Sequence, residues 1–142
     1  MEKTATSVGY RILSCKELSF DMTLSPSGKL NADEVSFTFN CKLKPEEPHL
    51  AIVLEANILI AGESSVKVVS ETTFEITPFD SAFDVPAAGK IVDHIGILPT
   101  LFGLAYSSTR GMMAIRTAGT RLGNYPLPII DAVDMTKKML RE

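Results

Sequence analysis

The chain has 142 residues, of which 45% are hydrophobic and 22% are charged, and its formal net charge at pH 7 is −3. This length predicts a single domain, 1–142, with a sizeable core, and the composition excludes an intrinsically disordered chain. The mildly acidic balance, without a dense block of Lys and Arg, argues against a protein that binds nucleic acid.

The first half of the chain alternates apolar and polar residues, which is typical of strands with one solvated face. The alternation is without a fault from Val35 to Leu43. Nearer the N-terminus the period slips, and one extra residue between Ser14 and Glu17, a β-bulge, would restore it. The predicted strands cover about 10–24, 34–44, 50–61 and 64–77.

The connections between these strands favour antiparallel pairing. Ala61-Gly62 reads as a two-residue hairpin turn, with Gly where a positive φ is needed. The stretch 44–49 is a rigid turn with two prolines, and 25–28 is a looser one. We therefore expect a four-stranded antiparallel meander with one apolar face.

The second half changes to helical spacing, as Leu101, Leu104 and Met112 illustrate. Gly119 is a natural helix stop and Asp131 a good N-cap for a later helix, whereas Pro99 could either start or kink the first one. The expected elements are a long helix over about 97–118, a loop over 119–130 and a short helix over about 131–141. The fold class is α+β.

Small residues recur along one face of the long helix, at spacings of three and four: Gly103, Ser107, Gly111, Ala114 and Ala118. Glycine inside a helix costs about 1 kcal/mol relative to alanine, so two of them indicate a close neighbour. We favour a contact with a second subunit. The alternative is that this stripe lies flat on the chain's own sheet.

The loop after the long helix, GTRLGNYPLPIIDA, is unusually apolar and shows neither helical nor strand periodicity. Connections are usually polar because they run over the surface. An apolar loop must either cover part of its own sheet or grip a partner, and the sequence leaves both interpretations open.

Catalytic signatures are missing from the sequence. It contains no phosphate-binding loop, no nucleophile elbow and no HExxH motif, and Asp93-His94 has the wrong spacing for a catalytic dyad. Cys15 and Cys41 have no partners at metal-ligand spacing and are expected to be reduced thiols. We therefore expect neither an enzyme nor a bound metal or cofactor.

The apolar segments are too short for a membrane-spanning helix, which needs about 20 residues. The longest candidate, at 50–61, contains Glu55 and Asn57. The N-terminus lacks the apolar run of a signal peptide. We expect a cytoplasmic protein without membrane insertion.

The order of elements and the second-half sequence together resemble the SecB export chaperone family. In that family a Pro, an apolar turn with an aromatic, a Tyr and an Arg open the long helix, as Pro99, Leu101-Phe102, Tyr106 and Arg110 do here. The loop is similar to the SecB crossover loop in its Gly119 and in Leu127-Pro128-Ile129.

The resemblance implies an ATP-independent holdase that binds unfolded polypeptides or preproteins for protein transport and translocation. It also implies a homotetramer, a dimer of dimers, in which sheets pair edge to edge and long helices pack between dimers. The small-residue stripe would then be the oligomer interface. Clients would lie in an apolar groove, and its predicted residues are Phe102, Tyr106, Leu122, Tyr125, Leu127 and Ile129. Leu127→Asp is expected to abolish client binding and to leave the fold intact.

SecB proteins hand clients to the SecA motor through acidic residues of the sheet, for which Glu71 and Glu75 are the candidates here. The basic terminal helix, ending KKMLRE, departs from that pattern. SecB-like proteins also protect antitoxins, and this remains an alternative to a role in export. The sequence is also compatible with a scaffold module that has one dedicated folded partner, and with a small-molecule binder that uses the space between sheet and helix.

Overall fold

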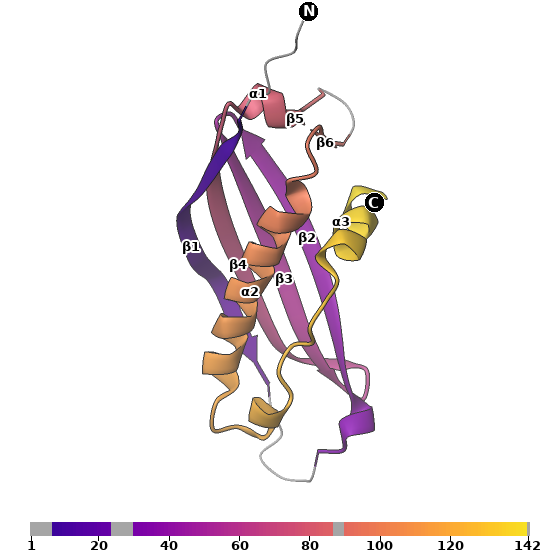
Figure 1. The fold of residues 1–142 in the computed structure, drawn as a ribbon. Coiled ribbons are helices and arrows are strands. Elements are labelled where there is room, and N and C mark those ends of the chain that lie inside the picture. The colour runs from indigo at the N-terminus through magenta and orange to yellow at the C-terminus, as the bar shows by residue number, and fades with distance from the viewer. Residues whose placement is uncertain (1–6, 24–29, 87–89, 142) are drawn as a thin grey trace, which may run out of the picture.

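The protein is described by a computed structural model that covers residues 7–23, 30–86 and 90–141. Its elements in chain order are β1 (Gly9–Met22), the 3-10 helix η1 (Ala32–Glu34), β2 (Val35–Glu46), β3 (His49–Ile60), β4 (Glu63–Thr77), α1 (Phe79–Ala82), β5 (Phe83–Asp84), β6 (Val92–Asp93), α2 (Leu98–Thr117), the 3-10 helix η2 (Arg121–Asn124) and α3 (Ala132–Arg141). The fold has two layers, with α2 lying across one face of a four-stranded antiparallel sheet and α3 on the same side (Figure 1). This α+β arrangement confirms the predicted fold class. We call the face under α2 the inner face and the opposite one the outer face.

The strand order corrects the prediction of a simple meander. The order is β1-β4-β3-β2, so only β2, β3 and β4 pair in sequence, and β1 pairs with β4. β1 and β2 are therefore the two edge strands, and the chain between them crosses from one edge of the sheet to the other. The loop at 119–130, which resembles the SecB crossover loop in sequence, instead joins α2 to α3. The predicted last residue of the first strand, Leu24, and the looser turn at 25–28 lie outside the described residues.

The hairpin at Ala61-Gly62 is confirmed. Both residues have positive φ, 51° and 83°, as the tight turns that match the twist of a hairpin require. On β1 the pairing with β4 has two irregularities, one between Ile12 and Ser14 and one between Glu17 and Ser19. The prediction of one bulge between Ser14 and Glu17 thus becomes two bulges that flank this segment.

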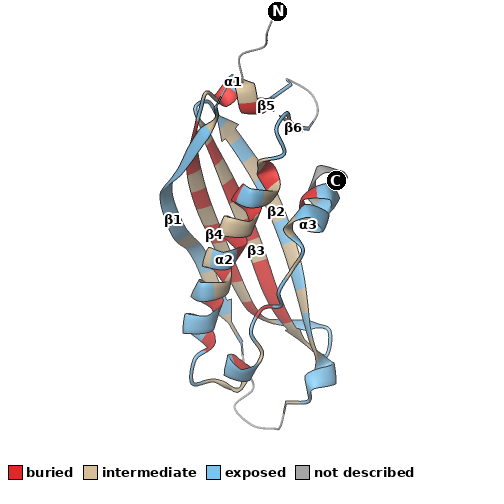
Figure 2. Ribbon diagram, in the orientation of Figure 1, coloured by how far each residue is buried: buried red, intermediate tan, exposed pale blue. Residues whose placement is uncertain are grey.

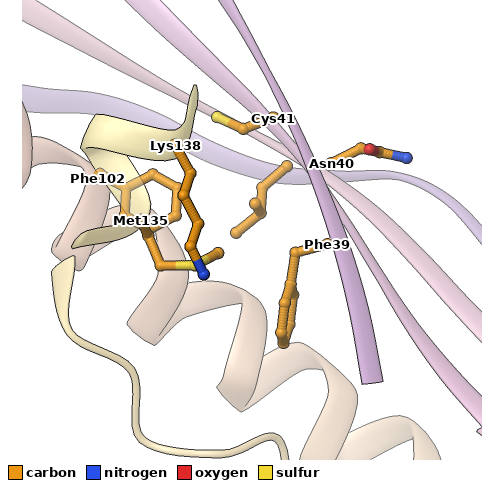
Figure 3. A pocket seen from close by; sticks show the side chains of 7 residues that line it. Phe39, Asn40, Cys41, Phe102, Met135 and Lys138 are labelled. Atoms are coloured by element: carbon orange, nitrogen blue, oxygen red, sulfur yellow. The ribbon is translucent and has the colours of Figure 1, made fainter. Parts of the chain in front are cut away.

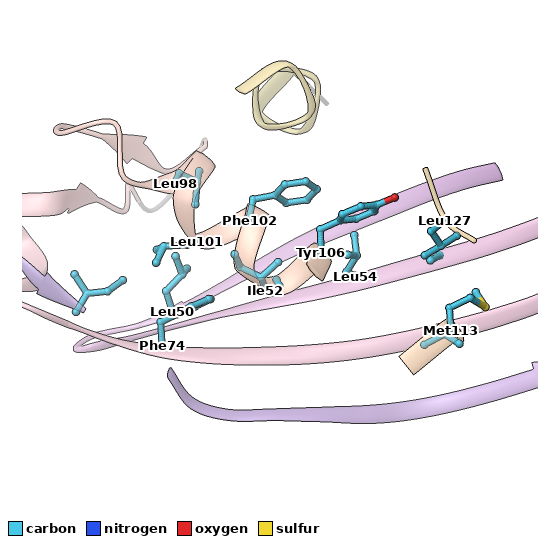
Figure 4. Close-up of a cluster of buried hydrophobic side chains, with 14 of the residues drawn as sticks. Leu50, Ile52, Leu54, Phe74, Leu98, Leu101, Phe102, Tyr106, Met113 and Leu127 are labelled. Atoms are coloured by element: carbon cyan, nitrogen blue, oxygen red, sulfur yellow. The ribbon is translucent and has the colours of Figure 1, made fainter. Parts of the chain in front are cut away.

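The core lies between the inner face of the two central strands and α2, as Figures 2 and 4 show. Leu50, Ile52 and Leu54 of β3 and Phe74 of β4 are fully buried there. The edge strand β1 is largely exposed because α2 lies over β3 and β4 (Figure 2).

The start and end of α2 follow from local chemistry. Leu98 is its first residue and Pro99 lies in the first turn, so the proline starts the helix and does not kink it. The Asp93 carboxylate accepts hydrogen bonds from the backbone N–H groups of Leu98 (2.8 Å) and Ile97 (3.1 Å). Gly119, with φ 80°, lies just beyond the C-terminus of the helix.

The shorter helix α3 is capped as predicted. The Asp131 carboxylate accepts hydrogen bonds from the backbone N–H groups of Val133 (2.9 Å) and Asp134 (3.2 Å). None of the helices described here is long and apolar enough to cross a membrane.

Candidate functional site

The loop that joins α2 to α3, residues 119–131, will be called the connecting loop. It begins with η2, a short 3-10 helix that the sequence pattern did not predict, in which the backbone N–H of Leu122 donates to Thr120 Oγ1 at 3.1 Å. Leu122 and Leu127 are buried in the hydrophobic core of the same chain. Of the two open interpretations, the structure therefore supports the one in which the loop covers its own sheet.

Hydrogen bonds from two tyrosine hydroxyls hold the connecting loop in place. Tyr106 of α2 donates a hydrogen bond to the Pro128 carbonyl oxygen at 2.6 Å, and Tyr125 donates to the Leu30 carbonyl oxygen at 3.3 Å. Burial raises the pKa of Tyr106 to about 12, although the nearby Arg110 opposes this increase. The Tyr106 hydroxyl thus keeps its proton, and its role as a donor, at neutral pH.

The six predicted groove residues differ in how far they are buried. Phe102, Tyr106, Leu122 and Leu127 are buried within the chain, Tyr125 is half-buried, and Ile129 has 86% of its surface exposed. An unfolded client can thus reach Ile129 and part of Tyr125 directly. The expectation that Leu127→Asp leaves the fold intact is wrong, since the carboxylate would be placed in the core.

A cavity of about 90 Å³ opens between β2, α2 and α3 (Figure 3). We call it the α3 pocket. It is lined by Phe39, Asn40 and Cys41 of β2, Leu54 of β3, Phe102 of α2, and Met135 and Lys138 of α3. A volume of this size exceeds the 10–15 Å³ or so that one water molecule needs, and its walls are mostly apolar.

Contacts along one side of the pocket keep its wall in place. The Phe39 ring meets Tyr106 edge-on at 5.5 Å, and Phe102 stacks on Tyr106 at 6.4 Å between ring centroids. Burial raises the pKa of the Cys41 thiol to about 12, so this group is a small apolar wall and not a nucleophile.

Sequence reasoning found one wall of this pocket, Phe102, and missed the others. Alternation placed Phe39 and Cys41 on the apolar face of their strand, but it gave no sign that α3 leaves them half-covered. On α3, Met135 and Lys138 lie three positions apart and so share one side of the helix. The helix dipole alone explains a lysine near the C-terminus of a helix, so Lys138 gave no sign of a pocket.

The small-residue stripe does not lie on the sheet. Ser107, Gly111, Ala114 and Ala118 are exposed, and a side chain at Gly111 would meet nothing within 4 Å. Gly103 differs, because a Cβ there would lie 3.7 Å from the Cβ of Ala132 on α3. The alternative of packing on the chain's own sheet is thus excluded for the four exposed residues, and the oligomer interface stays a prediction.

The two acidic residues predicted to meet a partner lie on the outer face of β4, and each is paired within the chain. Glu71 lies 3.6 Å from Lys16 Nζ and 3.7 Å from Lys44 Nζ. Glu75 is held by Arg11 at 3.1 Å, and His49 lies at 4.0 Å from its other oxygen. Their negative charge is largely balanced in place, and partner docking through them stays a prediction.

The neighbouring residues Asp93 and His94 each have a structural partner. Asp93 caps α2, and His94 Nε2 lies 3.0 Å from an Asp84 carboxylate oxygen. In the described part of the chain Cys15 and Cys41 are free thiols, and no group of three or more His, Cys, Asp or Glu residues is placed to hold a metal ion.

Comparison with known proteins identifies the fold. No protein-family model and no curated protein sequence matches the chain. Among solved structures, the chain is similar to the SecB-like chaperone Rv1957 of Mycobacterium tuberculosis, in complex with a ChAD peptide from the HigA1 antitoxin, with a TM-score of 0.53 and 11% identity over 85% of this chain and 89% of that one. The chain therefore has a SecB-like fold, as its sequence suggested, and at this identity the likeness concerns the fold.

Proposed function

We propose that this protein is an ATP-independent holdase chaperone that binds unfolded polypeptide segments at the α3 pocket and on the exposed apolar residues beside it. The pocket is the observation that carries the proposal, because it leaves Phe39, Cys41 and Met135 only half-covered. Ile129, which is exposed on the connecting loop, adds apolar surface on this side, since the preceding Pro128 is hydrogen-bonded to Tyr106, whose ring contacts the pocket residues Phe39 and Phe102. Such surfaces usually mark interaction sites.

The SecB-like fold supports this proposal, since the similar mycobacterial structure is a chaperone that holds a peptide. Tyr125 and Ile129 would contact clients directly, and Phe102 would line the pocket that receives a client side chain. Tyr106, Leu122 and Leu127 would join the surface only after the connecting loop moves. We further propose that the protein is cytoplasmic and forms homo-oligomers through the exposed stripe of α2.

Aggregation suppression tests the proposal. A chemically unfolded client is diluted into buffer with increasing amounts of the protein, in the absence of nucleotide, and light scattering is followed. We expect suppression near stoichiometric amounts with several unrelated clients. Unchanged scattering at a large excess of the protein would refute the holdase function.

A dedicated antitoxin chaperone is the second candidate, because the similar structure holds a peptide from an antitoxin. It predicts tight binding of one peptide and weak binding of unrelated unfolded chains, which the same assay with several clients would reveal. A role in export through SecA has less support here, since Glu71 and Glu75 already have partners. A scaffold with one folded partner would instead give a single stoichiometric protein in a pull-down and no suppression of aggregation.

A further inference from the structure

The α3 pocket combines apolar walls with one positive charge. Among the described residues that line it, Lys138 is the only charged one, and none of them carries a carboxylate. Figure 3 shows the Lys138 side chain running beside Met135 and Phe102, across from Phe39. A long lysine side chain can cover an apolar surface with its methylene groups and keep its ammonium group in water at the rim.

The ammonium group of Lys138 forms no salt bridge with another described residue, not even with Asp134 four positions earlier on α3. On the outer face, the carboxylate of Glu55, which accepts a hydrogen bond from the pocket residue Asn40 at 3.2 Å, is already bound by Lys67 at 3.0 Å. The pocket therefore presents a positive charge that the rest of the described chain does not neutralise.

We infer that the α3 pocket selects polypeptide segments in which an apolar side chain stands next to Asp or Glu. The apolar side chain enters the cavity between Phe39, Phe102 and Met135, and the neighbouring carboxylate meets Lys138 Nζ at the rim. This inference rests on the proposed function and assigns the class of client sequence. The complementary charge distinguishes such a segment from an apolar segment flanked by Lys or Arg.

The expected selectivity is modest because Lys138 is exposed. Solvent-exposed ion pairs contribute little, so an acidic flank should tighten binding about threefold over a neutral one at low ionic strength. A basic flank should weaken it by a similar factor. Both effects should shrink with added salt, since exposed charges are screened.

Three short peptides with the same central Leu and with Asp, Asn or Lys flanks test the inference by fluorescence anisotropy at low salt. For the natural chain we expect the affinity to decrease from the peptide with Asp flanks to that with Asn and then to that with Lys flanks. For Lys138→Glu we expect the reverse order of affinities. Lys138→Met, which keeps an apolar stem, should remove the preference. Lys137→Glu is the matched control, because Lys137 is exposed on α3 but does not line the pocket, and it should behave as the natural chain does.

A photoreactive residue in place of the central Leu locates the peptide, and we expect cross-links to Phe39 or Met135. Equal affinities for the three peptides, an unchanged order in Lys138→Glu, or cross-links confined to other surfaces would overturn the inference. If no peptide shows the preference and aggregation is still suppressed, the charge selection fails while the holdase function stands. If aggregation is not suppressed either, the proposed function has failed as well.

Discussion

Removing one hydroxyl should loosen the connecting loop without disturbing the core beneath it. Tyr106→Phe deletes the hydrogen bond of 2.6 Å to the Pro128 carbonyl oxygen. The remaining ring keeps its edge contact with Phe39 and its stacking on Phe102. The change is nearly isosteric, so no cavity forms.

The size of the effect follows from the burial of this bond. Tyr106 is only 4% exposed, and a hydrogen bond of this kind contributes a net ~1 kcal/mol. Because 1 kcal/mol corresponds to about a fivefold change in an equilibrium constant, the open population of the loop should rise about fivefold. The effect stays local if the loop opens before the sheet unfolds.

Amide hydrogen exchange measures this directly. The backbone N–H groups of Gly123 and Tyr125 are hydrogen-bonded within the connecting loop, to the carbonyl oxygens of Thr120 (3.1 Å) and Leu122 (2.9 Å). We expect them to exchange about fivefold faster in Tyr106→Phe, while exchange in the central strands stays unchanged. Tyr125→Phe is the matched control, since it removes a longer bond of 3.3 Å and should have a smaller effect. Loop exchange rates identical to those of the natural chain would show that the hydroxyl does not hold the loop.

Four further outcomes follow from the structure. Leu127→Asp should lower the free energy of unfolding by several kcal/mol in urea denaturation, because it buries a charge, whereas Leu127→Ala should cost about 2–3 kcal/mol. The pKa of Tyr106 is raised from an ordinary 10.0 to about 12, so the unfolded chain loses this proton first and stability should fall as pH rises between these values, less steeply in Tyr106→Phe. In a thiol-labelling time course at neutral pH, Cys15 should react promptly and Cys41 only after unfolding, and in Cys15→Ser only the slow reaction should remain. Asp93→Ala should cost about 1–2 kcal/mol in urea denaturation through loss of the α2 cap, and an unchanged midpoint would contradict that role.

The sequence predicts the four long strands and the two longer helices, α2 and α3, because their boundaries depend on neighbouring residues, whereas the short elements α1, β5, β6, η1 and η2 were not predicted. Pro99 and Gly119 delimit α2, and Asp131 begins α3, by interactions within a few positions along the chain. The period-2 alternation likewise depends only on which face of a strand is solvated. Each of these signals is local and is visible without any tertiary structure.

The strand order could not be predicted in this way. Alternation shows that the segment from Gly9 to Met22 is a strand, but it does not specify which neighbour the strand pairs with. The antiparallel partner of β1 is β4, which lies far along the chain beyond β2 and β3, and this choice depends on the crossing connection. A meander was the simplest topology for four strands and was wrong for the first of them.

The candidate site was only partly predictable for a similar reason. Leu127 and Ile129 both read as apolar loop residues, yet one is buried in the core and the other is almost fully exposed. Their different exposure results from the path that the connecting loop takes over the sheet, which the sequence pattern does not reveal. The α3 pocket forms where Phe39 and Met135, which are far apart in the sequence, come together. No local sequence pattern can indicate such a meeting.

A paired surface substitution tests the central claim, that unfolded clients bind beside the α3 pocket. Ile129 and Ile115 are matched, being 86% and 78% exposed, but Ile115 lies near the C-terminal end of α2, away from the pocket lining. Affinity for a permanently unfolded, fluorescently labelled protein is measured for Ile129→Asp and Ile115→Asp, after circular dichroism and analytical ultracentrifugation have verified that both keep the fold and the oligomeric state of the natural chain. We expect Ile129→Asp to weaken binding about tenfold, since burial of one such side chain contributes ~1.5–3 kcal/mol, and Ile115→Asp to leave it unchanged. Equal affinities of the two variants would contradict this location of the client-binding surface.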